Sequence, residues 1–376
     1  MRLAGCLAVE ACVAAVLVAG AAVGGARVVD LVRGSLAARG ARTVAAAAGG
    51  PPTVGGGGRG LRPTRDRDSA PLLQARQELS GEPAGDAPSD TAGTFLGMSD
   101  ELLLERLRTQ PVTRLKLNRG GSSLSFRVDF ADGSRAAWKP AQTNTQTIPR
   151  KEVAAYRLNK LLGLNAVPPA VQRSLPRDDL FSRLHPDSAP FLPRIRAETI
   201  IGPGGMISGE ASYWIPVIKD SPLDTPAGHA VIGDWLTQRQ PIPFESRSFA
   251  AQVARLVVFD FLIANPDRYS GGNMKVSASG EQLFFMDNTM SFFLDSDGPE
   301  KTRQVLYRTQ RFSRGLHHQL AQVDLPTLRR LMHEADGPDV LTDAEMRAVV
   351  QRRELVQRYI TDLAKLHGEP NVLFFP

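Results

Sequence analysis

The sequence predicts an α+β fold with two lobes: a small strand-rich lobe with one key helix, and a larger, mostly helical lobe. Three observations support this prediction. Apolar and polar residues alternate over 124–130, and after a turn 135–139 has the pattern of a returning strand. An amphipathic helix pattern covers 151–163. Helical patterns then dominate the second half of the chain, at 249–265, 300–311, 325–334 and 343–367.

The first 96 residues are expected to lie outside this fold. Ala and Val predominate in residues 3–26, which favours a signal peptide or an N-terminal membrane anchor over 1–26. Glu10 interrupts this stretch, so an apolar leader without an export role is the alternative. Residues 27–96 include GGPPTVGGGGRG and similar stretches that cannot bury a core, which predicts a disordered linker. The expected folded domain is 97–376.

The small lobe is expected over about 97–170, beginning with a short helix at 99–107. Lys139 ends the second strand of the predicted hairpin, and Glu152 opens the following helix, where its carboxylate would pair with the Lys139 ammonium. Gly120 and Gly121 precede the first clear strand in a Gly-Gly-Ser-Ser turn. Backbone N–H groups of such a turn suit a phosphate, and a plain hairpin turn is an equally good interpretation.

The large lobe is expected over about 171–376. Residues 171–246 are rich in Pro and Gly, with one predicted strand at 213–218 that we interpret as the connection between the lobes. The helix at 343–367 is predicted to begin with a capping box formed by Thr342 and Glu345 and to end at Gly368.

Polar residues gather after the apolar helix at 249–265. A loop holds Asp267 and Asn273, and a short hairpin then leads to Asp287 through the strand LFFMD. A carboxylate such as Asp267 would orient an attacking hydroxyl, and Asp287 and Asn273 offer oxygen ligands to a cation that neutralises phosphate charge. The order of these groups after Lys139 and Glu152 is the order that kinase-like folds use for phosphoryl transfer.

Each of these residues also has a purely structural interpretation. Asp267 follows Asn-Pro and suits an Asx turn, and Asp287 would close the hairpin strand. Lys139 would be a solvated strand end, and Glu152 a first-turn acid stabilised by the helix dipole. Taken singly, each structural interpretation is favoured, but the four in kinase order favour a functional site. Arg268 is expected to be structural, paired with a carboxylate near the loop.

Four separated segments together resemble one family. AAWKP, KEVAAYRLNKLLGLNAVPPAV, VFDFLIANPDRYSGGN and FFMDNTMSFF are similar to motifs of the secretory-pathway kinases, which include the Golgi casein kinase, the xylose kinase and four-jointed. The resemblance covers roughly 115–366. It implies a protein-kinase-like fold, ATP with Mn²⁺ or Mg²⁺ as cofactors, and a hydroxyl acceptor on a protein or a glycan.

The resemblance also implies roles for individual residues. Lys139 matches the phosphate-binding lysine and Glu152 its helix partner, Asp267 matches the catalytic aspartate, and Asp287 matches the metal-binding aspartate. Tyr269 departs from the family, which usually has His after the Asp-Arg pair. The chain has two cysteines, both in the N-terminal apolar segment, so no disulfide staples the expected domain. The Ala-, Gly- and Arg-rich composition suggests a bacterial-style minimal relative.

The expected function is ATP-dependent phosphoryl transfer by an enzyme that is exported or held at a membrane by its N-terminal segment. Two alternatives stay open: a catalytically inactive, nucleotide-binding pseudokinase, and an AMP transferase on the same fold. Asn273 lies six residues after Asp267, against five in ordinary kinases, and this spacing motivates the inactive alternative. The net charge of +6 owes much to arginines in the first 76 residues, so no nucleic-acid partner is expected. The sequence does not indicate an oligomeric state.

Overall fold

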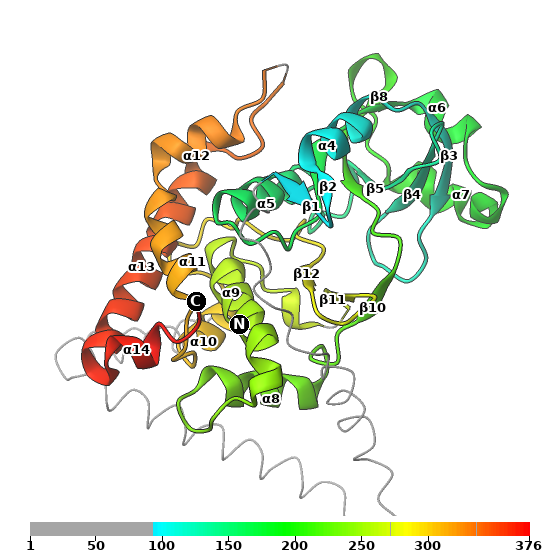
Figure 1. The fold of residues 1–376 in the computed structure, drawn as a ribbon. Coiled ribbons are helices and arrows are strands. Elements are labelled where there is room, and N and C mark those ends of the chain that lie inside the picture. Colours follow the sequence, from blue (N-terminus) through cyan, green and yellow to red (C-terminus); the bar gives the residue numbers. More distant parts are fainter. Residues whose placement is uncertain (1–92, 271, 336) are drawn as a thin grey trace, which may run out of the picture. The chain divides into compact units, whose positions relative to one another are not determined.

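The computed structural model describes residues 93–270, 272–335 and 337–376 (Figure 1). The expected leader, and the expected linker up to residue 92, lie outside these residues. Among the described helices, none is both long enough and apolar enough to span a membrane.

The strand-rich lobe is built on an antiparallel five-stranded sheet in the order β3-β4-β5-β9-β6. The predicted hairpin is present as two of its strands, in which Val128 lies opposite Ala136. Alternate side chains of the first hairpin strand are buried, as its apolar periodicity predicts. The sheet comprises β3 (Val112–Leu117), β4 (Phe126–Phe130), β5 (Arg135–Pro140), β6 (Ala170–Gln172) and β9 (Gly209–Tyr213).

The boundaries of this lobe differ from the predicted ones. Strand β1 (Thr94–Phe95) pairs with β2 (Met98–Ser99), and Phe95 is fully buried against Tyr213 and Phe284, so the fold begins before residue 97. At the other end, β6 and β9 belong to the sheet, so a division at about residue 170 cuts through it. Helix α4 (Asp100–Thr109) is capped by Ser99, close to its predicted position.

The segment between β6 and β9 adds short elements to this lobe. These are β7 (Leu175–Pro176), α6 (Arg177–Ser182), α7 (Leu192–Glu198) and β8 (Met206–Ile207), with 3₁₀ helices at Pro186–Phe191 and Pro203–Gly205. The strand predicted at 213–218 is wrong, because β9 ends at Tyr213 and β10 (Ile218–Asp220) belongs to a separate sheet. Pro216 has no N–H to donate to a strand ladder, and the chain crosses from one sheet to the other here.

The second sheet contains β10, β11 (Met274–Ser277) and β12 (Leu283–Phe285), so the hairpin predicted before Asp287 is confirmed. This sheet belongs to the large, mostly helical lobe. The helices of the large lobe are α8 (Pro226–Leu236), α9 (Arg247–Leu262), α10 (Glu300–Leu306), α11 (Arg314–Gln319), α12 (Leu325–Met332), α13 (Asp343–His367) and α14 (Glu369–Val372). Short 3₁₀ helices lie at Phe244–Ser246, Arg268–Ser270 and Leu320–Gln322. The capping box of α13 forms as predicted, whereas α10 ends five residues before the predicted 311.

Helix α5 (Arg150–Leu161) packs against both parts of the fold. Its apolar residues, among them Val153 and Leu158, belong to the same buried core as those of α9. It also contacts β6 and β9 of the five-stranded sheet. In Figure 1 it lies between that sheet and the helices α9 to α14. Glu152, in the first turn of α5, is close enough to Lys139 of β5 for the charges of the two side chains to act on each other.

Candidate active site

Lys139 and Asp287, which are 148 positions apart in the sequence, are in direct contact. The Lys139 Nζ donates to Asp287 Oδ1 at 2.5 Å. The Lys139 side chain is 10% exposed and that of Asp287 is 39% exposed, so the carboxylate reaches from a more open position to a buried ammonium. Asp287 has a φ of 52°, in the left-handed region that Asp and Asn tolerate best among side-chain-bearing residues. This left-handed turn lies just past the end of β12, since Asp287 is the second residue after Phe285.

The charges around this contact favour an ionised pair. Burial opposes the charge on Lys139, but the carboxylates of Asp287, Glu152 and Glu210 outweigh it and raise the pKa of Lys139. Burial also acts to raise the pKa of Asp287, but Lys139 and a hydrogen bond from Thr289 hold that pKa below its ordinary value. At neutral pH the site therefore contains an ammonium and a carboxylate.

Glu152 lies in the same cluster but does not form the expected ion pair with Lys139, since no nitrogen–oxygen distance between them is within 4.0 Å. Its two carboxylate oxygens accept hydrogen bonds from Asn288 instead, one from the backbone N at 2.6 Å and one from Nδ2 at 2.8 Å. The turn after β12 places both Asn288 donors against Glu152, and Lys139 pairs with Asp287. Burial raises the pKa of Glu152, although Lys139 and Asn288 act in the opposite direction.

Asp267 is held in place from both sides. Ser270 Oγ donates to its Oδ1 at 2.6 Å, and Asn273 Nδ2 donates to its Oδ2 at 3.0 Å. Its backbone N donates to Asn265 Oδ1 at 3.0 Å, so the Asx turn considered from the sequence also forms. Asn273, predicted as a metal ligand, thus uses its amide nitrogen to orient the predicted catalytic carboxylate.

Arg268 connects Asp267 to the loop that carries Asp287. Its side chain is fully buried, and its Nε lies 3.1 Å from both carboxylate oxygens of Asp260 on α9. The remaining guanidinium nitrogens donate to the carbonyls of Asn273 and Met286 and to Asn288 Oδ1. Burial raises the pKa of Asp260 to about 6, and Arg268 opposes this shift. The predicted structural role of Arg268 is confirmed.

Gly120 and Gly121 lie in the exposed loop between β3 and β4, where Asn118 N donates to the carbonyl of Ser125 at 2.8 Å. Gly120 has a φ of 105°, which side-chain-bearing residues rarely adopt. The loop follows a further strand, β3, that the sequence pattern did not indicate. Both interpretations of this turn, phosphate cradle and plain hairpin loop, agree with its position.

Sequence reasoning missed two residues of this site. Asn288 links Glu152 to Arg268, and only the fold brings those two side chains together. Glu210 lies opposite Lys139 in the β5–β9 register and is 1% exposed. Burial, together with the charges of Glu152 and Asp287, raises the pKa of Glu210 well above its ordinary value. The sequence signal that could have pointed to Glu210 is its place as a lone acidic residue within the strand GEASY.

The described residues contain no group of three or more His, Cys, Asp or Glu side chains arranged to hold a metal ion. A single free carboxylate oxygen is nevertheless suited to a phosphate-bound cation, since Mg²⁺ and similar ions take one or two carboxylates and complete their shell with phosphate and water. Asp287 Oδ2 accepts no hydrogen bond from the described residues, because both of its side chain's hydrogen bonds go to Oδ1.

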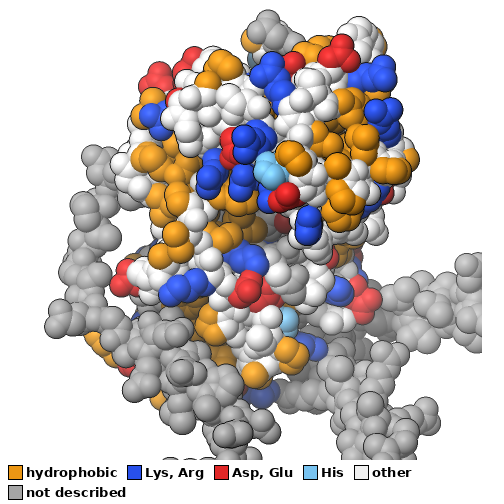
Figure 2. Space-filling view, turned by 90° about the vertical axis from the view of Figure 1, so that its right-hand side faces the viewer, with side chains coloured by type: hydrophobic (Ala, Val, Ile, Leu, Met, Phe, Trp, Pro, Cys, Tyr) orange, Lys and Arg blue, Asp and Glu red, His pale blue; other side chains and the backbone are white. Residues whose placement is uncertain are grey.

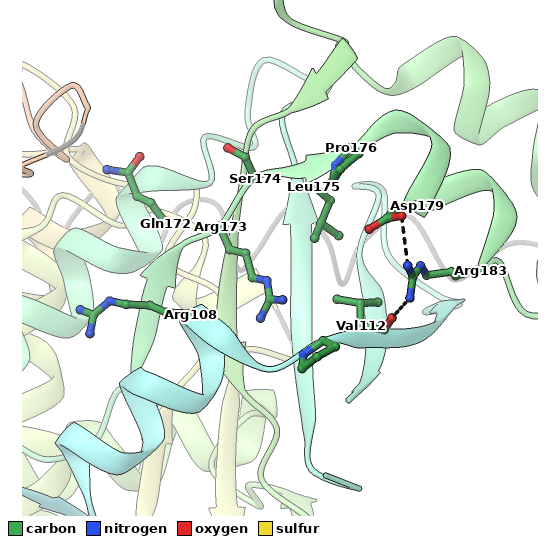
Figure 3. Close-up of a pocket in the computed structure, with 10 residues that line it drawn as sticks. Arg108, Val112, Gln172, Arg173, Ser174, Leu175, Pro176, Asp179 and Arg183 are labelled. Atoms are coloured by element: carbon green, nitrogen blue, oxygen red, sulfur yellow. Dashed lines mark hydrogen bonds and ion pairs between the residues drawn. The ribbon is translucent and has the colours of Figure 1, made fainter. Parts of the chain in front are cut away.

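A pocket of about 390 Å³ lies elsewhere on the protein, and none of the candidate site residues line it (Figure 3). Figure 3 shows Arg183 placed between Asp179 and the carbonyl of Val112, to which it donates. Arg173 similarly donates to the carbonyls of Leu107 and Gln110. Because these guanidinium groups already bind the protein, we interpret this pocket as structural.

On the face shown in Figure 2, Lys and Arg side chains lie in small groups, with apolar and uncharged side chains between them.

The chain matches no protein-family model. It is 23% identical over 305 residues to the pseudokinase FAM20A of Mus musculus, an alignment that covers 67% of this chain and 56% of that protein. It is 20% identical over 314 residues to the glycosaminoglycan xylosylkinase of Danio rerio, covering 72% of this chain and 76% of that protein. The chain thus spans just over half of the length of the mouse relative.

Solved structures agree with this similarity. The Golgi casein kinase with Mn/ADP bound superposes with a TM-score of 0.58 at 15% identity, covering 82% of this chain and 90% of that one. The hydra Fam20 structure with sugar gives a TM-score of 0.53 at 18% identity, covering 72% and 90%. The predicted resemblance to the secretory-pathway kinases is confirmed. The α+β, kinase-like fold of these enzymes is also the fold of this chain.

Proposed function

We propose that this chain transfers the γ-phosphoryl group of ATP to a hydroxyl group of a protein or a glycan. The observation that carries the proposal is the contact between Lys139 and Asp287 at 2.5 Å, because it joins the predicted phosphate-binding and metal-binding groups across the fold. Two relatives are named for kinase activity, a Golgi casein kinase and a glycosaminoglycan xylosylkinase. Their acceptors, one a protein and one a glycan, both offer hydroxyl groups.

Each residue of the site has a role in this proposal. Lys139 binds the α- and β-phosphates, and Asp267 accepts a hydrogen bond from the acceptor hydroxyl and orients it for in-line attack. Asp287 Oδ2, with the side-chain oxygen of Asn273, would hold Mn²⁺ or Mg²⁺, which supplies neutralisation of phosphate charge when bound. The hydrogen bonds from Ser270 and Asn273 limit the rotation of the Asp267 carboxylate and so pre-organise it.

We further propose that residues 1–26 direct the catalytic domain out of the cytoplasm or anchor it at a membrane, with 27–92 as a tether. The support is the Ala/Val-rich composition of the leader and the similarity to secretory-pathway kinases. A reporter fused after residue 92 should be found outside the cytoplasm. Retention of the fusion in the cytoplasm would contradict export.

The second candidate function is that of an inactive, nucleotide-binding scaffold. The similarity to the pseudokinase FAM20A favours it. An inactive scaffold would be expected to lack one of the catalytic groups, yet this chain has Lys139, Asp267 and Asp287, and all three side chains are hydrogen-bonded.

The deciding experiment incubates the full chain with Mn²⁺ and with ATP labelled on either the γ- or the α-phosphate, using casein and a xylose-bearing glycan as acceptors. Label transferred from the γ position alone supports phosphoryl transfer, and label from the α position would indicate AMP transfer instead. Nucleotide binding without transfer of either label would support the scaffold. Asp267→Asn, which keeps the size of the side chain, is the matched control.

A further inference from the structure

Glu210 is a buried carboxyl group whose oxygens have no hydrogen-bond partner among the described residues. It lies directly opposite Lys139 in the antiparallel β5–β9 ladder, so the two side chains are on the same face of the sheet. Its exposed fraction is 1%, so water does not replace the missing donors. Most buried polar groups in proteins are hydrogen-bonded, so such a group calls for an explanation.

The other two carboxylates around Lys139 are already engaged. Both oxygens of Glu152 accept hydrogen bonds from Asn288, and Asp287 accepts the present hydrogen bond from Lys139. Ser212, two residues along β9 and on the same face, lowers the pKa of Glu210, but its effect is smaller than those of burial and of the neighbouring charges. Glu210 is therefore the carboxylate of this cluster with an unused capacity to bind the ammonium.

Binding of a cation at Asp287 would change this arrangement. A divalent ion held by the Asp287 carboxylate would repel the Lys139 ammonium, which lies 2.5 Å from the same carboxylate, and this repulsion would be strong in a partly buried site. The ammonium would then move from Asp287 toward the nucleotide phosphates, and a carboxylate beside it would keep it charged and limit where it lies. A carboxylate on the adjacent strand can accept it without a change of strand register.

We propose that Glu210 is a positioning residue that holds the Lys139 ammonium when Asp287 binds a metal–nucleotide complex. The inference rests on the proposed function for its second step, the binding of metal at Asp287. Its first step, that Glu210 is the alternative counter-ion of Lys139, depends only on the geometry of the two strands. The two steps are tested separately.

The first test measures the stability of the full chain without nucleotide, using Asp287→Asn, Glu210→Gln and the double variant. Each single variant leaves one of these two carboxylates beside Lys139, whereas the double variant leaves only Glu152, whose oxygens are already hydrogen-bonded to Asn288. The melting temperature of the double variant should fall by about 4 °C more than the sum of the two single losses. Additive losses would overturn the inference. Glu345→Gln removes another buried carboxylate, one that contacts Arg150, and should be additive with Asp287→Asn.

The second test titrates Mn²⁺ by the electron paramagnetic resonance signal of the free ion, in the presence of a non-hydrolysable ATP analogue. Glu210→Gln should weaken Mn²⁺ binding about tenfold, since Lys139 then continues to compete for Asp287. Glu210→Asp keeps the charge and should weaken it only about threefold. Wild-type Mn²⁺ affinity in the Glu210→Gln variant would overturn the inference. If the Glu210→Gln variant does not fold, Glu210→Asp takes its place in both tests.

These outcomes separate the two proposals. If the wild-type chain transfers no phosphate but the stability losses are non-additive, the proposed function fails and the counter-ion role of Glu210 stands. If the γ-phosphate is transferred while the losses are additive and Mn²⁺ affinity is unchanged in the variants, this inference alone fails.

Discussion

At the scale of single residues, the orientation of Asp267 decides whether the site can activate a hydroxyl. Asp267→Asn keeps the size of the side chain but weakens its ability to accept the hydroxyl proton. We expect the transfer rate to fall about 10²–10⁴-fold, with ATP binding within about threefold of wild type. Single-turnover transfer and calorimetric ATP binding measure the two effects. Ser270→Ala removes one of the two side-chain donors to this carboxylate and should cost about tenfold or less.

The second residue-scale prediction concerns Asp287 and the metal. Asp287→Ala removes the proposed carboxylate ligand, so transfer should be abolished, as it should be when EDTA is added to the wild-type chain. Weak nucleotide binding through Lys139 should persist, as measured by calorimetry without metal. Thr289→Ala, which removes a hydrogen bond to Asp287 but keeps the Asp287 carboxylate, serves as the control and should retain metal-dependent transfer. Near-normal turnover of the Asp287→Ala variant would show that the metal site lies elsewhere.

At the scale of elements, Arg268 joins α9, the loop of Asp267 and the loop after β12. Arg268→Met should destabilise the fold by about 3–5 kcal/mol, because it leaves the buried Asp260 carboxylate without its partner. The double variant Asp260→Asn/Arg268→Met should be more stable than Arg268→Met alone. Urea unfolding measures both. A double variant that is less stable than the single one would mean that the charge of Asp260 is not what makes Arg268 necessary.

The contact between α5 and the loop after β12 gives a second element-scale prediction. Glu152→Gln provides only one acceptor atom for the two Asn288 donors, so both stability and transfer should fall. The effect of Glu152→Gln on turnover should be non-additive with that of Asn288→Ala. With Lys139→Met it should be closer to additive, because the two side chains form no ion pair within 4.0 Å. The reverse pattern would restore the Lys139–Glu152 pair expected from the sequence.

At the scale of the whole molecule, the N-terminal limit of the fold can be tested with two truncations. Deletion of residues 1–92 should leave a folded, active domain, since the described cores lie within 93–376. Deletion of residues 1–96 also removes Phe95, and loss of such a buried aromatic side chain should cost about 3–5 kcal/mol. Thermal unfolding of both fragments measures the difference. Equal melting temperatures would mean that Phe95 contributes little to the core.

Much of this molecule was predictable from local patterns in the sequence. Alternation over 124–130, the helical periodicity of α5 and α9, and the capping box of α13 are set by neighbouring residues, so they appear without knowledge of the fold. The order of Lys139 and Asp287 along the chain, together with their flanking motifs, indicated the kinase-like fold. The local pattern gave a wrong prediction at 213–218. The apolar pattern continues across Pro216 there, but the strand pairing does not.

The partners within the site were decided only by the tertiary structure. Lys139 contacts Asp287 instead of Glu152, because a left-handed turn at Asp287 brings its carboxylate to the ammonium and presents Asn288 to Glu152. Glu210 joins the cluster because β9 pairs with β5, although the two strands are about seventy residues apart in the sequence. Periodicity is a property of adjacent residues, whereas the choice among nearby charged partners depends on distances that strand pairing and helix packing create.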